Sequence, residues 1–155
     1  QEIEQLPDFH SVIGLGGGQA LDVAKFIIWN RRVPLFQVPT AMTVDAAFGH
    51  RAAIRLEGNV RYIGWAVPEA VYIDVATLGT LDDRQYRAGL VESIKHAAIR
   101  DVEYFGFFEQ NIQGICDKQM DLLEQIAYKN CSIKQDTPEP RFLFRFVRRL
   151  DPRNY

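Results

Sequence analysis

The feature that most constrains the fold is a short apolar segment that runs into three consecutive glycines and a helical pattern. Ser11–Leu15 is apolar and is followed by Gly16–Gly18, which predicts a buried strand and then a tight turn suited to residues without a Cβ. Ala20–Asn30 carries apolar residues at helical spacing, and Pro34–Val38 is a second short strand that Pro39 ends. A strand, a helix and a strand in this order predict a right-handed βαβ unit with parallel strands.

The next segment, Thr40–Val67, is less regular, and a β-hairpin is expected around Glu57–Asn59. Ala70–Asp74 is apolar and predicts a third strand. After Leu81 the pattern becomes helical. Asp82 and Asp83 can cap a helix, and the expected helices extend to Ala97 and then cover about Val102–Glu109 and Lys118–Lys134.

This order predicts an α/β fold class: a partial Rossmann-like parallel sheet followed by an all-helical domain. We expect residues 1–81 to form a nucleotide-binding α/β part whose N-terminal units are missing. Residues 82–135 would begin an all-helical domain, and residues 136–155 would form an atypical tail. Because residues 1–10 supply no first strand, we expect the chain to be a fragment of a longer protein.

The tail has a different pattern from the rest of the chain. Pro138 and Pro140 end the last helical pattern, and Arg141–Arg149 mixes Phe and Arg in a way that fits neither period. Three interpretations stay open: a strand, a partner-binding tail, and a sequence that has lost its original reading frame.

Composition excludes several classes of protein. The 155 residues carry a net charge of −2, which argues against the broad basic face of a nucleic-acid-binding protein. No apolar run approaches the ~20 residues that span a bilayer, and Gln1–Glu4 lacks the order of a signal peptide. Cys116 and Cys131 cannot build a disulfide framework. We therefore expect a cytoplasmic protein with reduced thiols and without nucleic-acid or membrane partners.

Two groups of residues suggest chemistry. Glycines between a strand and a helix let backbone amides approach a pyrophosphate at the helix N-terminus, and Asp22 is expected in the first helical turn. Gly14-x-Gly16-x-x-Gln19 lacks the third glycine of the Rossmann fingerprint, so a plain tight turn stays an alternative.

The second group is Glu92, Lys95 and His96, which share one face of a helix because they lie three and four residues apart. A carboxylate there can bind a divalent metal and a lysine can hold an anion. An exposed ion pair is the alternative. Zinc-ligand spacing is absent from the histidines, which are His10, His50 and His96.

Several motifs follow one another in a recognisable order. They are Gly16–Gly18 with Asp22, Val38–Thr40, Val44-Asp45, Tyr72–Asp74, Leu78–Leu81, Arg87–Lys95 and Cys131–Lys134. Together they resemble the dehydroquinate synthase family, within the superfamily that includes glycerol dehydrogenases and iron-containing alcohol dehydrogenases. The segment Ala88-Gly89-Leu90-x-Glu92-x-Ile94-Lys95 is the most specific of them, and the resemblance covers roughly residues 11–135.

The resemblance implies roles for individual residues. The NAD-binding residues would be Gly16, Gly17, Gly18 and Asp22, with Thr40 and Thr80 near the dinucleotide. Asp45 would lie between cofactor and substrate, and Glu92 would bind a divalent metal, zinc or cobalt. Lys95 and Lys134 would grip a small anionic phosphorylated substrate. The resemblance leaves the oligomeric state open and admits a homodimer.

The implied reaction belongs to the shikimate pathway of aromatic amino acid biosynthesis. It converts a seven-carbon keto sugar-acid phosphate to 3-dehydroquinate by transient oxidation, phosphate elimination, reduction and ring closure. NAD would take and return a hydride, and the metal would polarise the reacting oxygens.

The chain also departs from the family pattern. Gly49-His50-Arg51 replaces Gly-Gly-Lys, so Arg51, a candidate catalytic residue, keeps the charge without the lysine geometry. Glu57-Gly58-Asn59 replaces Gly-Lys-Asn. No histidine follows His96, whereas the family's two histidine ligands follow the segment that matches Lys134. We therefore expect this chain to supply one metal ligand of three and not to hold a metal unaided.

The favoured hypothesis is a dehydroquinate synthase-like carbon–oxygen lyase of which this chain is an incomplete, central part. Two alternatives remain: an NAD-dependent polyol or glycerol-type dehydrogenase of the same superfamily, and a truncated, non-catalytic homologue.

Overall fold

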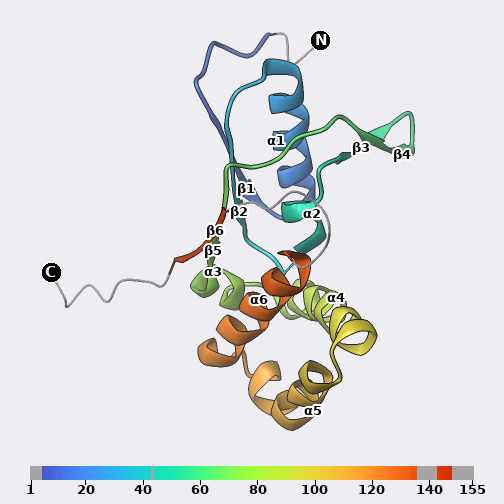
Figure 1. Ribbon diagram of the computed structural model, residues 1–155, viewed down its shortest axis with the longest axis vertical. Coiled ribbons are helices and arrows are strands. Elements are labelled where there is room, and N and C mark those ends of the chain that lie inside the picture. Colours follow the sequence, from blue (N-terminus) through green and yellow to red (C-terminus); the bar gives the residue numbers. More distant parts are fainter. Residues whose placement is uncertain (1–4, 43, 136–142, 148–155) are drawn as a thin grey trace, which may run out of the picture.

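A parallel sheet and the helix packed on it form one half of the molecule, and a group of helices forms the other (Figure 1). The computed structural model describes residues 5–42, 44–135 and 143–147. The sheet has the strand order β1-β2-β5-β6, with all its pairs parallel. Its strands are β1 (Val12–Gly16), β2 (Leu35–Pro39), β5 (Ala70–Asp74) and β6 (Leu143–Val147). The predicted α/β class, a parallel sheet followed by helices, is confirmed.

Helix α1 (Gly18–Arg31) connects β1 to β2 and buries Leu21, Ala24 and Ile28. It approaches β1 closely, since a Cβ on Gly14 would lie 2.8 Å from the Cβ of Ala24. The predicted parallel βαβ unit is therefore confirmed. One detail was wrong: the helix begins at Gly18, so its first turn holds no acidic residue and Asp22 lies in the second turn.

The expected hairpin is present in the segment that looked irregular. Strands β3 (Ala52–Leu56) and β4 (Asn59–Ile63) pair antiparallel, with Leu56 opposite Asn59. The two turn residues Glu57 and Gly58 have φ of 49° and 81°, the positive values that a tight two-residue hairpin turn requires. The same segment also holds α2 (Val44–Phe48), which was not predicted.

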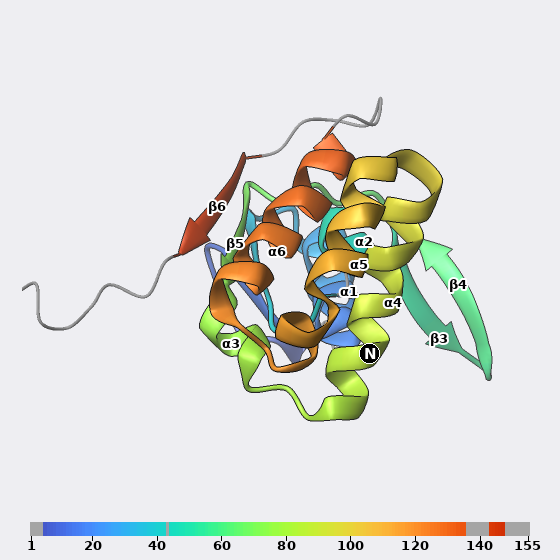
Figure 2. The same ribbon diagram turned by 90° about the horizontal axis from the view of Figure 1, so that it is seen from below.

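The helical half contains α3 (Val75–Gly79), α4 (Asp83–Arg100), α5 (Val102–Cys116) and α6 (Met120–Gln135), with α4, α5 and α6 in front in Figure 2. The Asp82 side chain accepts a hydrogen bond from the Gln85 amide and caps α4, as predicted. Asp101 caps α5 in the same way through the Tyr104 amide. Helix α5 continues about two turns beyond the expected end at Glu109.

The larger hydrophobic core runs through both halves of the molecule. Leu21 and Val71 of the α/β half and Ile115, Leu123 and Ile126 of the helical half are fully buried in it. A smaller cluster of Ala24, Ile28, Leu35 and Ala66 lies against α1. One cluster of buried side chains therefore includes residues of both the sheet and the helices.

Of the three interpretations of the tail, a strand is confirmed for residues 143–147. Leu143 lies opposite Ala70 in the parallel pair of β6 and β5. Pro138, Pro140 and the two ends of the Phe/Arg segment lie outside the described residues. Among the helices that are described, none has the length and apolar character to cross a membrane.

Candidate functional site

The glycine turn opens the N-terminus of α1 to an incoming ligand. Gly16 has φ of 143°, and its carbonyl oxygen accepts a hydrogen bond of 2.9 Å from the Thr40 amide. Gly17 is the N-cap of α1 and makes no side-chain capping bond. A Cβ built on Gly17 would meet nothing within 4 Å, so this position faces open space. The first amides of α1 beside a bare backbone form an arrangement that can hold a pyrophosphate.

Asp22, which was expected to contact the cofactor, forms an ion pair with a buried lysine on its own helix. Its carboxylate lies 2.6 Å from the Lys25 ammonium, and both residues are buried. Lys25 Nζ also donates to the carbonyl oxygens of Gly49 (3.1 Å) and Arg51 (2.8 Å). The pair therefore ties α1 to the segment between α2 and β3.

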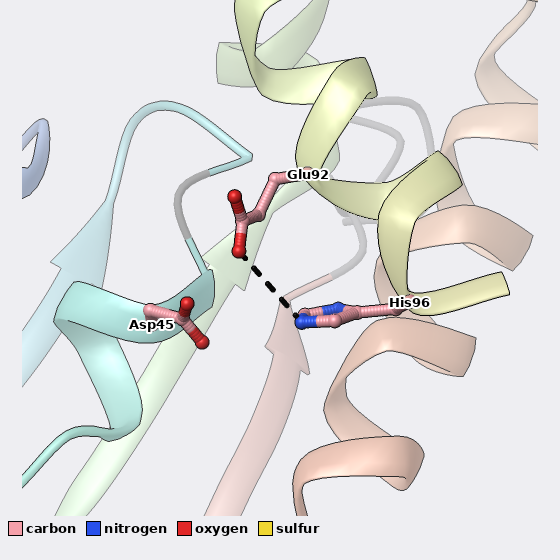
Figure 3. A group of neighbouring side chains, drawn as sticks. All are labelled: Asp45, Glu92 and His96. Carbon is pink, nitrogen blue, oxygen red and sulfur yellow. Dashed lines mark ion pairs between the residues drawn. The ribbon is translucent and has the colours of Figure 1, made fainter. Parts of the chain in front are cut away.

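A second arrangement brings three potential metal ligands together (Figure 3). Asp45 on α2 and Glu92 and His96 on α4 each offer one ligand atom, and these atoms all lie within 4.8 Å of one another. His96 Nε2 lies 3.8 Å from Glu92 Oε1. Asp45 is exposed, Glu92 is half-buried and His96 is buried, so the group is open on one side. We call Asp45, Glu92 and His96 the carboxylate–imidazole cluster.

Local packing places α4 beside α2. Gly89 on α4 approaches the segment before α2 so closely that a Cβ there would lie 3.0 Å from the Cβ of Met42. Next to Glu92, Ser93 is fully buried and accepts a hydrogen bond of 2.6 Å from Nδ2 of Asn130 on α6. These contacts hold α4 with Glu92 and His96, one turn apart, turned towards Asp45.

Lys95 lies at the edge of the cluster. Its ammonium pairs with Glu92 Oε1 and lies 3.8 Å from Asp45 Oδ2. The hydrogen bond to Glu92 raises the pKa of Lys95, and partial burial opposes this change. Lys95 is therefore a cation held against two carboxylates of the cluster.

The donor set fits a divalent cation. Two carboxylates and one imidazole are oxygen and nitrogen ligands of the kind that zinc and related ions take. Cys131 is not among the residues whose ligand atoms lie together, and burial raises the pKa of its thiol to about 12.

The glycine turn and the cluster meet at α2. A Cβ on Gly18 would lie 3.4 Å from the Cβ of Ala46, which follows Asp45 in the sequence. The first residue of α1 is thus packed on the short helix that supplies one ligand of the cluster. The structure therefore connects the candidate pyrophosphate-binding turn to the candidate metal ligands.

The remaining predicted residues lie around these two features. Thr40 is half-buried beside Gly16, whereas Thr80 is the exposed C-cap of α3 and donates to the Thr77 carbonyl. Arg51 is exposed just before β3. Lys134 belongs to α6, and its side chain lies outside the described part of the chain.

Sequence reasoning identified Glu92 but not its two companions as metal ligands. The signal for His96 was present, because it follows Glu92 by four residues and so shares its helix face. No local signal connects Asp45 to them, since it lies on another helix. The expectation of a single metal ligand from this chain stays a prediction, and the structure places Asp45 and His96 close to that ligand.

The chain matches a known family over its first half. Residues 4–88 match the family model described as 3-dehydroquinate synthase N-terminal. The 3-dehydroquinate synthase of Thermoanaerobacter sp. (strain X514) is 39% identical over 129 residues, which cover 80% of this chain and 36% of that protein. The corresponding enzyme of Desulforamulus reducens is 40% identical and is covered to 37%. The chain therefore spans little more than a third of the length of these relatives.

Solved structures share the fold. A 2-epi-5-epi-valiolone synthase from Streptomyces hygroscopicus subsp. jinggangensis 5008, with NAD⁺ and Zn²⁺ bound, aligns with a TM-score of 0.73 at 24% identity. The alignment covers 85% of this chain and 39% of that one. An iron-containing alcohol dehydrogenase from Thermotoga maritima aligns with a TM-score of 0.69 at 17% identity, covering 86% of this chain and 46% of the other. These likenesses describe the architecture that carries the site.

Proposed function

The chain belongs to the 3-dehydroquinate synthase family, and on that premise we propose that it forms the dinucleotide-binding part and part of the metal site of a 3-dehydroquinate synthase-like lyase. The substrate would be a seven-carbon keto sugar-acid phosphate, and the products would be phosphate and 3-dehydroquinate. The connection of the glycine turn to the carboxylate–imidazole cluster through Gly18 and Ala46 carries this proposal. The enzyme would act in the cytoplasm, where its thiols stay reduced.

The residues have separate parts in the proposed reaction. The amides at Gly16–Gly18 hold the pyrophosphate of NAD, and the carboxylate–imidazole cluster holds a divalent metal. When bound, NAD accepts and returns a hydride and the metal polarises the reacting oxygens. Lys95, together with Arg51 and Lys134, supplies positive charge for the phosphate and carboxylate groups of the substrate. Asp22 supports the cofactor site indirectly, by fixing Lys25.

The metal site is tested by substituting its central ligand. Glu92→Ala should weaken binding of Co²⁺ at least tenfold, measured by isothermal titration calorimetry, because it removes the carboxylate that lies beside both Asp45 and His96. Glu109→Ala, on α5, is the matched control and should leave the affinity unchanged. Unchanged Co²⁺ affinity in Glu92→Ala would remove this residue from the ligand set.

The cofactor site is tested at Gly17. Gly17→Val should lower NAD⁺ affinity at least tenfold, because its side chain would fill the space that the pyrophosphate needs. Gly106→Val is the matched control, since a Cβ on Gly106 also meets nothing within 4 Å but lies on α5. Titration of both variants with NAD⁺ gives the comparison. Normal affinity in Gly17→Val would overturn the assignment of the turn.

The reaction itself separates the alternatives. Phosphate release from the seven-carbon substrate, dependent on NAD⁺ and Co²⁺ and stopped by a chelator, would support the lyase. Net production of NADH from glycerol would support a polyol dehydrogenase, to which the fold likeness to an iron-containing alcohol dehydrogenase also points. NAD⁺ binding with neither reaction would identify a non-catalytic homologue.

A further inference from the structure

A groove lies between α5 and α6, which pack against each other in the helical half of the molecule (Figure 2). Its volume is about 630 Å³, and the aromatic rings that line it belong to Tyr104, Phe107 and Tyr128. Tyr104 is buried and Phe107 is half-buried, whereas Tyr128 is 57% exposed. None of the described lining residues belongs to the glycine turn or to the carboxylate–imidazole cluster. We call this feature the α5–α6 groove, and it offers aromatic surface to a docking segment.

The lining of the α5–α6 groove is also acidic. Glu103 of α5 and Asp121 and Glu124 of α6 contribute carboxylates, and Lys129 contributes the one ammonium among the described lining residues. That ammonium lies 2.7 Å from the carboxylate of Asp101, which is not among those lining residues, so its charge is already balanced. The chemistry of the groove therefore fits an occupant that carries positive charge next to apolar or aromatic groups.

One segment of this chain has that composition. Residues 148–155 follow β6, lie outside the described residues and have the sequence Arg148-Arg149-Leu150-Asp151-Pro152-Arg153-Asn154-Tyr155. The segment holds three arginines against one aspartate, in a chain whose net charge is −2. An arginine guanidinium pairs with carboxylates and stacks on aromatic rings, so arginine is suited to a groove that has both.

The topology brings the start of this segment near one end of the groove. Val147, the last residue of β6, lies opposite Asp74 in the parallel pair with β5. Asp74 caps α3, and the far end of that short helix reaches α6, since a Cβ on Gly79 would lie 3.4 Å from Sδ of Met120. Asp121, the next residue along α6, lines the groove. The end of β6 and the groove are therefore connected through α3.

Residues 148–155 are long enough to reach the groove within one molecule. One strand spacing, the length of α3 and one contact between helices separate Val147 from Asp121, which is roughly 20 Å in all. An extended chain advances ~3.3 Å per residue, so Arg153, six residues beyond Val147, can lie about that far from it. The arginine side chain extends this reach further.

We propose that residues 148–155 dock in the α5–α6 groove of their own chain. Arg153 pairs there with Asp121 and Glu124, and Tyr155 packs on the aromatic lining. The docked segment supplies the positive charge that the groove needs and covers its exposed aromatic surface. This inference does not rest on the proposed function, and it gives a role to the part of the tail beyond β6.

The first experiment identifies the carboxylates that Arg153 contacts. Arg153→Lys keeps the charge and introduces an amine, which a water-soluble carbodiimide couples to a carboxylate in contact with it. We expect crosslinks from position 153 to Asp121 or Glu124, identified by mass spectrometry after digestion. Arg55→Lys, at an exposed position on β3, is the matched control and should give no crosslink to these two carboxylates. If position 153 gave no crosslink, or crosslinks spread over carboxylates outside the groove, the proposal would be overturned.

Isotope labelling separates docking within one chain from docking between two chains. The Arg153→Lys protein is crosslinked as an equal mixture of unlabelled and ¹⁵N-labelled chains. Each crosslinked pair of peptides should be either wholly unlabelled or wholly labelled, because both peptides come from the same chain. Pairs that combine a labelled with an unlabelled peptide would show that a second copy supplies the segment, which contradicts docking in the same chain.

The second experiment leaves the tail unchanged and alters the groove. Asp121→Asn combined with Glu124→Gln removes two charges of the lining and keeps the shapes of the side chains. Trypsin should then cleave at the arginines of residues 148–155 severalfold faster than in the wild type, because an undocked segment is open to the protease. Glu69→Gln combined with Glu109→Gln, at two exposed positions outside the groove, is the matched control and should be cleaved as the wild type is. Equal cleavage rates in all three proteins would show that the groove does not hold the segment.

Discussion

Lys25 shows how a single buried charge can organise a site that it does not touch. Its ammonium, on α1, contacts the Asp22 carboxylate and two carbonyl oxygens of the segment between α2 and β3. That segment begins at Gly49, directly after α2, and α2 carries Asp45 of the carboxylate–imidazole cluster. The same lysine therefore fixes the helix of the glycine turn and the short helix of the cluster to each other.

We expect Lys25→Met to destabilise the chain by roughly 3–5 kcal/mol, because it leaves the Asp22 carboxylate buried without its partner. Urea unfolding measures the loss. Asp22→Asn combined with Lys25→Met should recover part of it, since the double variant buries no charge. Lys129→Met, which breaks a partly exposed pair, should cost much less. A small loss in Lys25→Met, similar to that of Lys129→Met, would show that the pair is not essential to the fold.

At the scale of residues, the sequence predicted which residues belong to the site better than it predicted which residues they contact. Glu92 was identified as a metal ligand from its helix, and it lies in the cluster. Asp45 was placed near the substrate because of the resemblance, but its proximity to Glu92 and His96 depends on packing between α2 and α4. Asp22 was assigned to the cofactor, and the structure adds an ion pair with the buried Lys25 that the sequence did not predict. Such pairings depend on tertiary distances that no local pattern records.

At the scale of elements, Asp101 joins two helices of the helical half. It caps α5 through the Tyr104 amide at 2.9 Å, and its other carboxylate oxygen lies 2.7 Å from Lys129 on α6. The hydrogen bond from Lys129, followed by that from the Tyr104 amide, lowers the pKa of Asp101 below its ordinary value of 3.8. Ionised Asp101 is therefore the form that the folded chain favours.

This shift predicts how stability depends on pH. Because the folded pKa is lowered, the contribution of Asp101 is fully present above 3.8 and is lost as pH falls through the lower folded value. Asp101→Asn keeps a capping side chain but loses the charge. Thermal unfolding should therefore show the wild type more stable than Asp101→Asn at pH 7, with the difference shrinking as the pH falls below 3.8. A difference that does not shrink as the pH is lowered would mean that the charge is not responsible.

Secondary-structure elements were predicted well where the sequence contains several turns of a helical pattern or a clear strand pattern. They were predicted poorly where the sequence contains neither. The strand Ala70–Asp74 was predicted with the bounds that the structure shows. The five-residue helices α2 and α3 are too short to display a helical period. Helix α5 was ended too early because polar residues follow Glu109, although Ile115 continues the apolar face and is fully buried. Its far end packs on α6, which only the tertiary structure reveals.

At the scale of the whole molecule, the two halves share their interior. Leu21 of α1 and Ile73 of β5 belong to the same core as Leu123 and Ile126 of α6. The sequence suggested a boundary near residue 81, where strands give way to helices. A change from strands to helices in the sequence pattern shows where the secondary structure changes. It does not show whether the apolar faces of the two halves pack against each other. The carboxylate–imidazole cluster also takes one ligand from the first half and two from the second.

A shared core predicts that both halves unfold together. Trp29 on α1 and Trp65 before β5, the two tryptophans of the chain, both report on the α/β half, whereas far-UV circular dichroism is dominated by α4, α5 and α6. Urea unfolding curves from tryptophan fluorescence and from circular dichroism should therefore coincide, with one midpoint. Leu123→Ala, in the helical half, should cost about 2–5 kcal/mol and move both curves equally. If it moved the circular dichroism curve alone, the helices would form an independent unit, and the cluster would depend on docking of two separately stable parts.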